Sequence, residues 1–435
     1  MTISPFEERY RTKMNNIFED KNKYAKWMDV EIALAKAHFE LGNIEKKDYE
    51  NIKKAKEKVK IERIIEIEND IHHDLMAMVK AMSEQAGESG GKIHLGATSY
   101  DIEDTATALI FKEAIELMEK DLSEFLELLK KMALAHKKTV CIGRTHGQHA
   151  TPTTYGMKFA LYYSETKRNL ERLKEVKKRI LVGKMSGAVG TKATFGEHAE
   201  QIEKKVMKEL GLEAAQVTTQ VIQRDRHAEV LSIISLTACT LEKIAKEIRN
   251  LQRTEILEVG EPFGKKQVGS STMPHKRNPH KSERVCSLAR VVRANLSVAF
   301  ENIALEHERD LTNSANERII FSQIFIATNY MLKQMHMILE TLEFYPENMK
   351  KNLEKTLGLI MAERVMIALS KKGVGRQEAH EIVREIAQKA FKEGKHLKEE
   401  VKKLGKFTSK ELEELFDYSS YIGDAERIVE NAVKK

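Results

Sequence analysis

The chain has 435 residues, of which 41% are apolar and 32% are charged, and its formal net charge is +7. This length is sufficient for a large core and for two or three domains. Lys and Glu are interleaved along the chain. The charge therefore indicates a solvated helical surface and disfavours a nucleic-acid partner, while the small basic excess suits an anionic small substrate.

Cysteine spacing and hydropathy predict a soluble, cytoplasmic protein. Cys141, Cys239 and Cys286 lie too far apart for a structural zinc site or a disulfide framework, so we expect reduced thiols. The first residues lack the apolar core of a secretory signal, and no run of about 18 apolar residues is present. We therefore expect no membrane partner.

Apolar residues recur every three or four positions over long stretches, which predicts an all-α fold. The clearest apolar faces cover residues 109–129, 159–181 and 230–251. The chain has only six prolines, and an α-helix is the element that tolerates interior proline least. Faces of this length favour a helical bundle or an oligomeric assembly. The best short strand candidate is 139–143.

Irregular stretches predict the domain boundaries. A glycine-rich stretch at 87–100 leads into the first long helix, for which 101–104 supplies a cap and an acidic first turn. Tyr345-Pro346 marks a second boundary. We expect an N-terminal helical domain (1–95), a central domain of long helices with a loop at 264–279 (96–345) and a C-terminal helical domain (346–435).

Four breaks in the helical pattern carry more polar side chains than a turn requires, and functional groups often lie on loops held by a rigid scaffold. The first break is His72-His73-Asp74. Adjacent histidines on a helix point to different faces, which argues against a two-ligand metal site. Two interpretations stay open: a polar helix start, or an imidazole that is oriented by a carboxylate and contacts an anion.

The second break contains His94 followed by Thr98 and Ser99, directly before a predicted helix. A helix N-terminus is a natural anion site. Capping of the helix by one hydroxyl group is the alternative, but two hydroxyl groups and an imidazole exceed what a cap requires.

The third break, 143–152, places His146 close to two glycines after a short apolar run. Core packing explains such a histidine poorly. Imidazole is the side chain best suited to proton transfer near neutral pH, so we predict a functional role for His146.

The fourth break, 269–279, combines a Gly-Ser-Ser turn, two prolines and consecutive basic side chains, and it cannot continue a helix. A serine hydroxyl is a poor base until its alkoxide is stabilised. Nearby cations such as Lys276 and Arg277, backbone N–H groups and exclusion of water would supply that stabilisation. We predict that this loop carries a catalytic serine.

This loop resembles the signature of the fumarase/aspartase superfamily, whose members eliminate fumarate from succinyl adducts. The string Met-Pro-His-Lys-Arg-Asn-Pro at 273–279 is similar to the adenylosuccinate lyase branch, although the 3-carboxymuconate cycloisomerases share it. The motifs that favour adenylosuccinate lyase are Arg9-Tyr10, His72-His73-Asp74, Thr98-Ser99-Tyr100-Asp101 with Asp104, 143–148, Gln220 within 219–225, and 306–314 with Arg318. His72 stands where many relatives carry arginine.

The resemblance implies three helical domains, with the central helices forming a twenty-helix core in a homotetramer whose active sites draw residues from three subunits. It implies an enzyme of purine nucleotide biosynthesis that acts without a metal or cofactor. The reaction is anti β-elimination of fumarate from adenylosuccinate, giving AMP, and from the succinocarboxamide ribotide SAICAR, giving AICAR.

The resemblance also implies a role for each matching residue. Ser270 takes the carbon proton, and His146, oriented by Glu283, protonates the departing nitrogen. Lys276 stabilises the dianion that forms, and whether Ser270 or Ser271 is the base stays open. The residues implied in substrate binding are Arg9, Tyr10, His72, His73, Asp74, His94, Thr98, Ser99, Gln220, Ser271, Asn278, Arg309, Ser314 and Arg318.

Two alternatives to this function remain. One is another superfamily member, such as 3-carboxymuconate cycloisomerase or argininosuccinate lyase. Arg9-Tyr10 and the arginines suited to a phosphate argue against it. The other is a helical scaffold protein, in which we would expect the loops to carry only ordinary polar residues.

Overall fold

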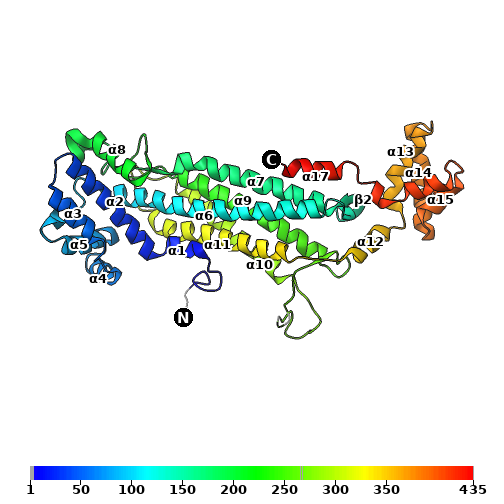
Figure 1. The fold of residues 1–435 in the computed structure, drawn as a ribbon, viewed down its shortest axis with the longest axis horizontal. Coiled ribbons are helices and arrows are strands. Elements are labelled where there is room, and N and C mark those ends of the chain that lie inside the picture. The colour runs from blue at the N-terminus through cyan, green and yellow to red at the C-terminus, as the bar shows by residue number, and fades with distance from the viewer. Residues whose placement is uncertain (1–3, 265, 267, 435) are drawn as a thin grey trace. The chain divides into compact units, whose positions relative to one another are not determined.

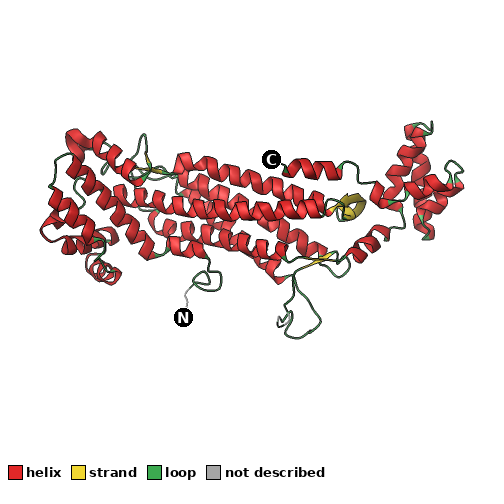
Figure 2. Ribbon diagram, in the orientation of Figure 1, coloured by secondary structure: helices red, strands yellow, loops and turns green. Residues whose placement is uncertain are grey.

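The computed structural model describes residues 4–264, 266 and 268–434. Within these residues it contains seventeen α-helices and six short β-strands (Figure 1). Figure 2 shows how little of the chain is strand, and the predicted all-α class is confirmed. Over the described part of the chain, no helix combines the length and the apolar content needed to cross a membrane.

The five longest helices are α6 (Ser99–Ala135), α7 (Tyr155–Ile180), α9 (Asp225–Leu251), α10 (His280–Glu301) and α11 (Ser314–Glu340). Three of them, α6, α7 and α9, contain the predicted apolar faces. On α9, every member of the predicted face is at most 4% exposed, namely Val230, Ile234, Ala238, Leu241, Ala245, Ile248 and Leu251. The three-to-four spacing places these side chains on one side of the helix, where burial stabilises it.

The chain divides into two compact units, and each of the five long helices contributes residues to both. Unit 1 contains the residues up to 123, 169–239 and 287–333. Unit 2 contains 124–168, 240–286 and the residues from 334 onward. Each unit is described by itself below.

Unit 1 begins with short helices that pack around a common core. They are α1 (Lys13–Phe18), α2 (Asp20–Glu40), α3 (Lys46–Ala55), α4 (Ile61–Ile71), α5 (Asp74–Ala86) and the 3₁₀ helix η1 (Gly87–Lys92). Helix α2 contacts α3, α5 and α8 (Ala199–Leu210), and the buried core between them includes Trp27, Leu34 and Met78. The remaining elements are η2 (Ala193–His198) and the parallel pair β3 (Val182–Gly183) and β4 (Glu213–Ala214).

Unit 2 contains the C-terminal helices and a β-hairpin. The helices are α12 (Pro346–Glu354), α13 (Ala362–Lys371), α14 (Arg376–Glu393), α15 (Leu397–Lys403), α16 (Ser409–Leu415) and α17 (Ala425–Val433), with the 3₁₀ helices η3 (Leu359–Met361) and η4 (Tyr418–Ser420). The antiparallel pair β5 (Val259–Gly260) and β6 (Glu343–Phe344) precedes them. Helix α12 starts at Pro346, where proline is favoured because its missing N–H has no partner to lose.

The hairpin of unit 2 joins β1 (Val140–Thr145) to β2 (Gln148–Thr154). The predicted strand at 139–143 is therefore confirmed, and β1 extends two residues further. Ile142 of β1 is fully buried in the core that α13 to α16 build. His146 and Gly147 form the turn, with φ values of 52° and 74°. Both values are positive, which is typical of a two-residue turn that matches the twist of a hairpin.

Candidate active site

The predicted site residues fall into two groups, one in each compact unit. Unit 1 holds the predicted substrate-binding residues from Arg9 to Arg318 other than Ser271 and Asn278. Unit 2 holds His146, Glu283 and the signature loop. The division separates the residues predicted to bind the nucleotide from those predicted to transfer protons.

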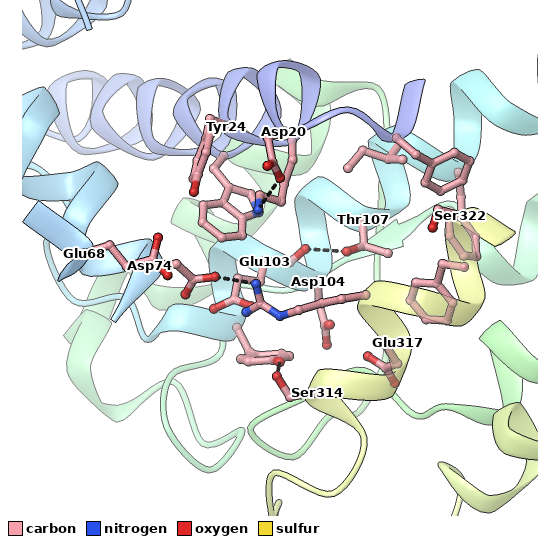
Figure 3. Close-up of a pocket in the computed structure, with 18 of the residues that line it drawn as sticks. Asp20, Tyr24, Glu68, Asp74, Glu103, Asp104, Thr107, Ser314, Glu317 and Ser322 are labelled. Carbon is pink, nitrogen blue, oxygen red and sulfur yellow. Dashed lines mark hydrogen bonds and ion pairs between the residues drawn. The ribbon is translucent and has the colours of Figure 1, made fainter. Parts of the chain in front are cut away.

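Unit 1 contains a cavity of about 460 Å³ between side chains of α2, α4, α5, α6 and α11 (Figure 3). Three predicted site residues line it: Asp74, Ser314 and Arg318. Part of its wall is aromatic, with Trp27 and Phe111 among the lining residues. The cavity therefore offers an aromatic surface beside eight charged side chains, of which six are acidic and two, Lys23 and Arg318, are basic.

Asp74 and Arg318 form an ion pair in this cavity, with Nη1 of Arg318 2.7 Å from Oδ2 of Asp74. Burial acts to raise the pKa of Asp74, but the hydrogen bond and charge of Arg318 outweigh it, so this pKa lies below its ordinary value. The side chain of Arg318 is 50% exposed. Because guanidinium has five N–H donors, Arg318 can pair with Asp74 and still bind an anion.

The two adjacent histidines lie at a helix boundary. His72 ends α4 with a φ of 53°, and His73 caps α5 by accepting a hydrogen bond at Nδ1 from the N–H of Met76 at 3.4 Å. Nε2 of His73 lies 3.4 Å from Oγ of Ser99. The polar helix start is thus present, and His73 also reaches a hydroxyl predicted to bind substrate.

His94 is held by the buried carboxylate of Glu31. Nδ1 of His94 lies 2.7 Å from Oε1 of Glu31, and its backbone N–H donates to Oε2 at 3.1 Å. Burial lowers the pKa of His94, but the bond and charge of Glu31 raise it by more, so the net shift is upward. Glu31 thus holds the imidazole of His94 in one orientation.

Thr98 and Ser99 begin α6, and the carboxylate of Asp101 organises this start. Oδ2 of Asp101 accepts the backbone N–H of Thr98 at 2.9 Å, and Oδ1 accepts the N–H of Ser186 at 2.8 Å. Lys184, which is fully buried, forms an ion pair with the same carboxylate. Thr98 and Ser99 are both partly exposed, and among the described residues no backbone group bonds to either hydroxyl.

A chain of contacts joins three further predicted residues through Tyr100. Nη1 of Arg309 donates to Oε1 of Gln220 at 2.9 Å, and its guanidinium lies 3.6 Å above the ring of Tyr100. The hydroxyl of Tyr100 lies 3.5 Å from Oγ of Ser314. The stacking and the hydrogen bond hold Arg309 in one orientation.

Arg9 and Tyr10 lie apart from these contacts. Arg9 is exposed, and the ring of Tyr10 packs against Tyr330 with their centroids 5.1 Å apart. Neither residue is among those that line the cavity of unit 1.

A buried charge cluster of unit 1 was not predicted as a unit. Arg224 donates to Asp104 at 2.9 and 3.0 Å and to Glu317 at 2.7 and 3.2 Å. Burial acts to raise the pKa of both acids. For Asp104 the charge of Arg224 outweighs burial, and the pKa is lowered; for Glu317 burial prevails, and the pKa is raised. Burial and Arg224 together lower the pKa of the neighbouring His227 to about 3. Through these contacts Arg224, directly before α9, connects Asp104 of α6 with Glu317 in the first turn of α11.

In unit 2, His146 occupies the exposed tip of the hairpin. The hairpin is anchored by the buried carboxylate of Glu258, which accepts hydrogen bonds from Arg144 Nη2 at 2.6 Å, Tyr155 Oη at 2.9 Å and Asn352 Nδ2 at 2.9 Å. The imidazole is therefore presented on a rigid support and is open to a ligand.

The signature loop lies between β5 and α10, and Figure 1 shows it extending away from the helix that follows it. Lys265 and Gln267 of this loop lie outside the described residues. Oγ of Ser270 accepts the backbone N–H of Met273 at 3.0 Å and that of Thr272 at 3.3 Å. Two such donors favour a negatively charged oxygen.

Gly269 and Asn278 close the base of this loop. Nδ2 of Asn278 donates to the carbonyl oxygen of Gly269 at 2.9 Å. A Cβ atom at Gly269 would lie 2.1 Å from the carbonyl oxygen of Lys276, so only glycine fits there. The loop thus depends on glycine for a close approach of two backbone segments.

A second cavity, of about 810 Å³, lies beside the loop in unit 2 and is lined by Lys276, Asn278 and Glu283 together with Arg249 and Arg253. Glu283 is exposed in the first turn of α10. Within the described part of unit 2, the structure records no hydrogen bond between Glu283 and His146.

Comparison with known proteins assigns the chain to a family. A model of the lyase family matches residues 8–294, and a model described as adenylosuccinate lyase C-terminus matches 358–432. The chain is 56% identical to adenylosuccinate lyase of Pyrococcus abyssi and 50% identical to that of Methanocaldococcus jannaschii, covering all of this chain and 98% and 96% of those proteins.

Solved structures share the fold at lower identity. The 3-carboxy-cis,cis-muconate lactonizing enzyme from Pseudomonas putida matches 99% of this chain and 98% of its own, with a TM-score of 0.92 and 32% identity. A fumarate lyase from Mesorhizobium matches 97% of each chain, with a TM-score of 0.90 and 30% identity. The fold is therefore common to several lyases, whereas the higher identity over the full length identifies the branch. The chain belongs to the adenylosuccinate lyase family.

Proposed function

We propose that this protein cleaves adenylosuccinate to AMP and fumarate, and SAICAR to AICAR and fumarate, in purine nucleotide biosynthesis in the cytoplasm. The observation that carries the proposal is the pair of arginines in unit 1. Arg318 and Ser314 line one cavity, and Arg309 stacks on Tyr100 of the same cavity. Paired guanidinium groups beside a hydroxyl suit a phosphate, and the nucleotide substrates carry one.

Proton abstraction is proposed for the signature loop. Ser270 takes the proton from the carbon beside a carboxylate of the succinyl group, and the electrons of that C–H bond become the double bond of fumarate. The two N–H groups that point at Oγ of Ser270 stabilise the alkoxide needed for this step. Lys276 and Asn278 stabilise the charge on the carboxylate, and Ser271 is the alternative base.

Protonation of the leaving group is proposed for His146. The C–N bond breaks with its electron pair on nitrogen, and the imidazolium of His146 supplies the proton. Glu283 is proposed to orient this imidazole. Imidazole suits the role because its ordinary pKa lies near neutrality, so it is often protonated and still releases the proton readily.

Substrate binding is proposed for the predicted residues of unit 1. Thr98, Ser99 and Gln220 bind the succinyl carboxylates and their linker. The residues proposed to line the nucleotide pocket are Arg9, Tyr10, His72, His73, Asp74, His94, Arg309, Ser314 and Arg318. We also propose a homotetramer that shares its active sites between subunits, and a division into three domains at residues 95 and 345.

A direct assay tests the proposed function. Purified protein is incubated with adenylosuccinate, and AMP and fumarate are quantified by chromatography. We expect both products in equal amounts, and the same result with SAICAR giving AICAR. Parallel incubations with argininosuccinate and 3-carboxymuconate test the other members of the superfamily. Turnover of one of these compounds without turnover of adenylosuccinate would refute the proposal.

A further inference from the structure

Glu103 of α6 lines the cavity of unit 1 and lies near Asp74 and Asp104 (Figure 3). Glu103 is partly buried. Among the described residues, the structure records no hydrogen bond or ion pair to this carboxyl group. The sequence indicated only a helix-capping role for the acidic residues at 101–104, and the structure places Glu103 inside a ligand-sized cavity.

Two other acidic residues that line the cavity are paired with cations. On α2, Nζ of Lys23 lies 2.8 Å from Oδ1 of Asp20. On α5 and α11, Asp74 pairs with Arg318 at 2.7 Å. An ionised Glu103 would add a negative charge that the charges of Arg318 and Arg309 oppose only in part.

The charges of the remaining titratable groups around the cavity are paired, screened or absent. Asp104 of α6 and Glu317 of α11 share Arg224. Glu68 of α4 is partly exposed, so solvent screens its charge. Burial raises the pKa of Tyr24 to about 12 and also raises that of Tyr100, so both hydroxyls are neutral.

The protonation state of Glu103 follows from this setting. Burial and the charge of Asp74 raise the pKa of Glu103 to about 8, while Arg318 acts in the opposite direction. At neutral pH the group is therefore a carboxylic acid, which can donate a hydrogen bond. A neutral acid beside Arg318 does not repel an anion, whereas a carboxylate would.

We propose that Glu103 is a substrate-binding residue whose neutral carboxyl group donates a hydrogen bond to the phosphate of the nucleotide bound by Arg318 and Ser314. This inference rests on the proposed function and adds a donor to its phosphate site. A hydrogen bond from a carboxylic acid to a charged oxygen is short and strong. The bond also distinguishes a phosphorylated nucleotide from its nucleoside.

The proposal predicts how AMP affinity depends on pH. Bound phosphate stabilises the protonated form of Glu103. The affinity for AMP is therefore highest below the pKa of about 8 and falls as pH rises through this pKa. Between pH 7 and pH 9 the affinity for AMP should fall by about tenfold. The phosphate itself is fully ionised over most of this range, since its second pKa is about 6.

Isothermal titration calorimetry of the full-length protein tests this. We expect about a tenfold weaker Kd for AMP at pH 9 than at pH 7, and uptake of about half a proton on binding at pH 8. The Glu103→Gln variant keeps a donor of similar shape and cannot titrate, so its Kd should be nearly equal at the two pH values, with no proton uptake. Glu68→Gln is the matched control and should keep the wild-type pH dependence.

Adenosine provides a test that needs no variant. It lacks the phosphate, so its affinity for the wild-type protein should not change between pH 7 and pH 9. The inference is overturned if AMP affinity is independent of pH, or if Glu103→Gln shows the wild-type loss. The two proposals fail separately: turnover of adenylosuccinate with pH-independent AMP binding overturns only the role of Glu103. Absence of both turnover and AMP binding overturns the proposed function and this inference with it.

Discussion

Replacement of Arg224 by methionine tests the buried charge cluster of unit 1. Methionine keeps most of the length and apolar contact of the arginine stem, so the loss is mainly electrostatic. The variant leaves Asp104 and Glu317 buried without the guanidinium that donates four hydrogen bonds to them. Removal of one partner from a buried ion pair costs about 3–5 kcal/mol in the free energy of unfolding, and we expect a loss of that size.

The loss should depend on pH, and its sign follows from the pKa shifts. In the wild type, Arg224 holds the pKa of Asp104 below its ordinary value, so this group stabilises the fold at neutral pH and ceases to do so as pH falls through that low pKa. Without Arg224, burial raises the pKa of Asp104 and raises that of Glu317 further. Both acids can then take up protons at pH 5, so destabilisation should be larger at pH 8 than at pH 5.

Urea unfolding followed by circular dichroism at the two pH values measures this effect. The control is Arg384→Met, which removes an ion pair with Glu381 whose side chains are 44% and 53% exposed. Exposed pairs contribute at most about 1 kcal/mol, and the control should show no more than that. A loss for Arg224→Met that equals the control, or that is the same at both pH values, refutes the reasoning.

Three predictions concern catalysis. Ser270→Ala should lower kcat by orders of magnitude without changing the oligomeric state, and a near-normal rate, with loss of activity in Ser271→Ala instead, would move the base to Ser271. His146→Ala should lower kcat by a factor of about 10² to 10⁴, and added imidazole should restore part of it; a wild-type rate in the variant would exclude the acid role. Gly269→Ala should lower kcat while the far-UV circular dichroism spectrum stays unchanged, because a Cβ atom 2.1 Å from the carbonyl oxygen of Lys276 displaces the loop; wild-type kcat would contradict the requirement for glycine.

Local patterns in the sequence were sufficient for the helices and for several loops. The apolar face at 230–251 predicted α9 because helical periodicity is set within a few residues. The short strand at 139–143 and the unusual position of His146 were also visible. The second strand was not predicted, since 148–154 contains Pro152, which has no backbone N–H to donate. It pairs with β1 through the tight turn at His146-Gly147.

The sequence by itself therefore determined the all-α class, the non-helical signature loop and the family, because each depends on residue spacing along the chain. Only the tertiary structure decided the state of buried charges. Glu103 and Asp104 are neighbours on α6, yet Asp104 meets Arg224 and ionises, while Glu103 faces a cavity and stays protonated at neutral pH. The physical reason is that a pKa depends on burial and on nearby charges, and both are supplied by helices distant in sequence.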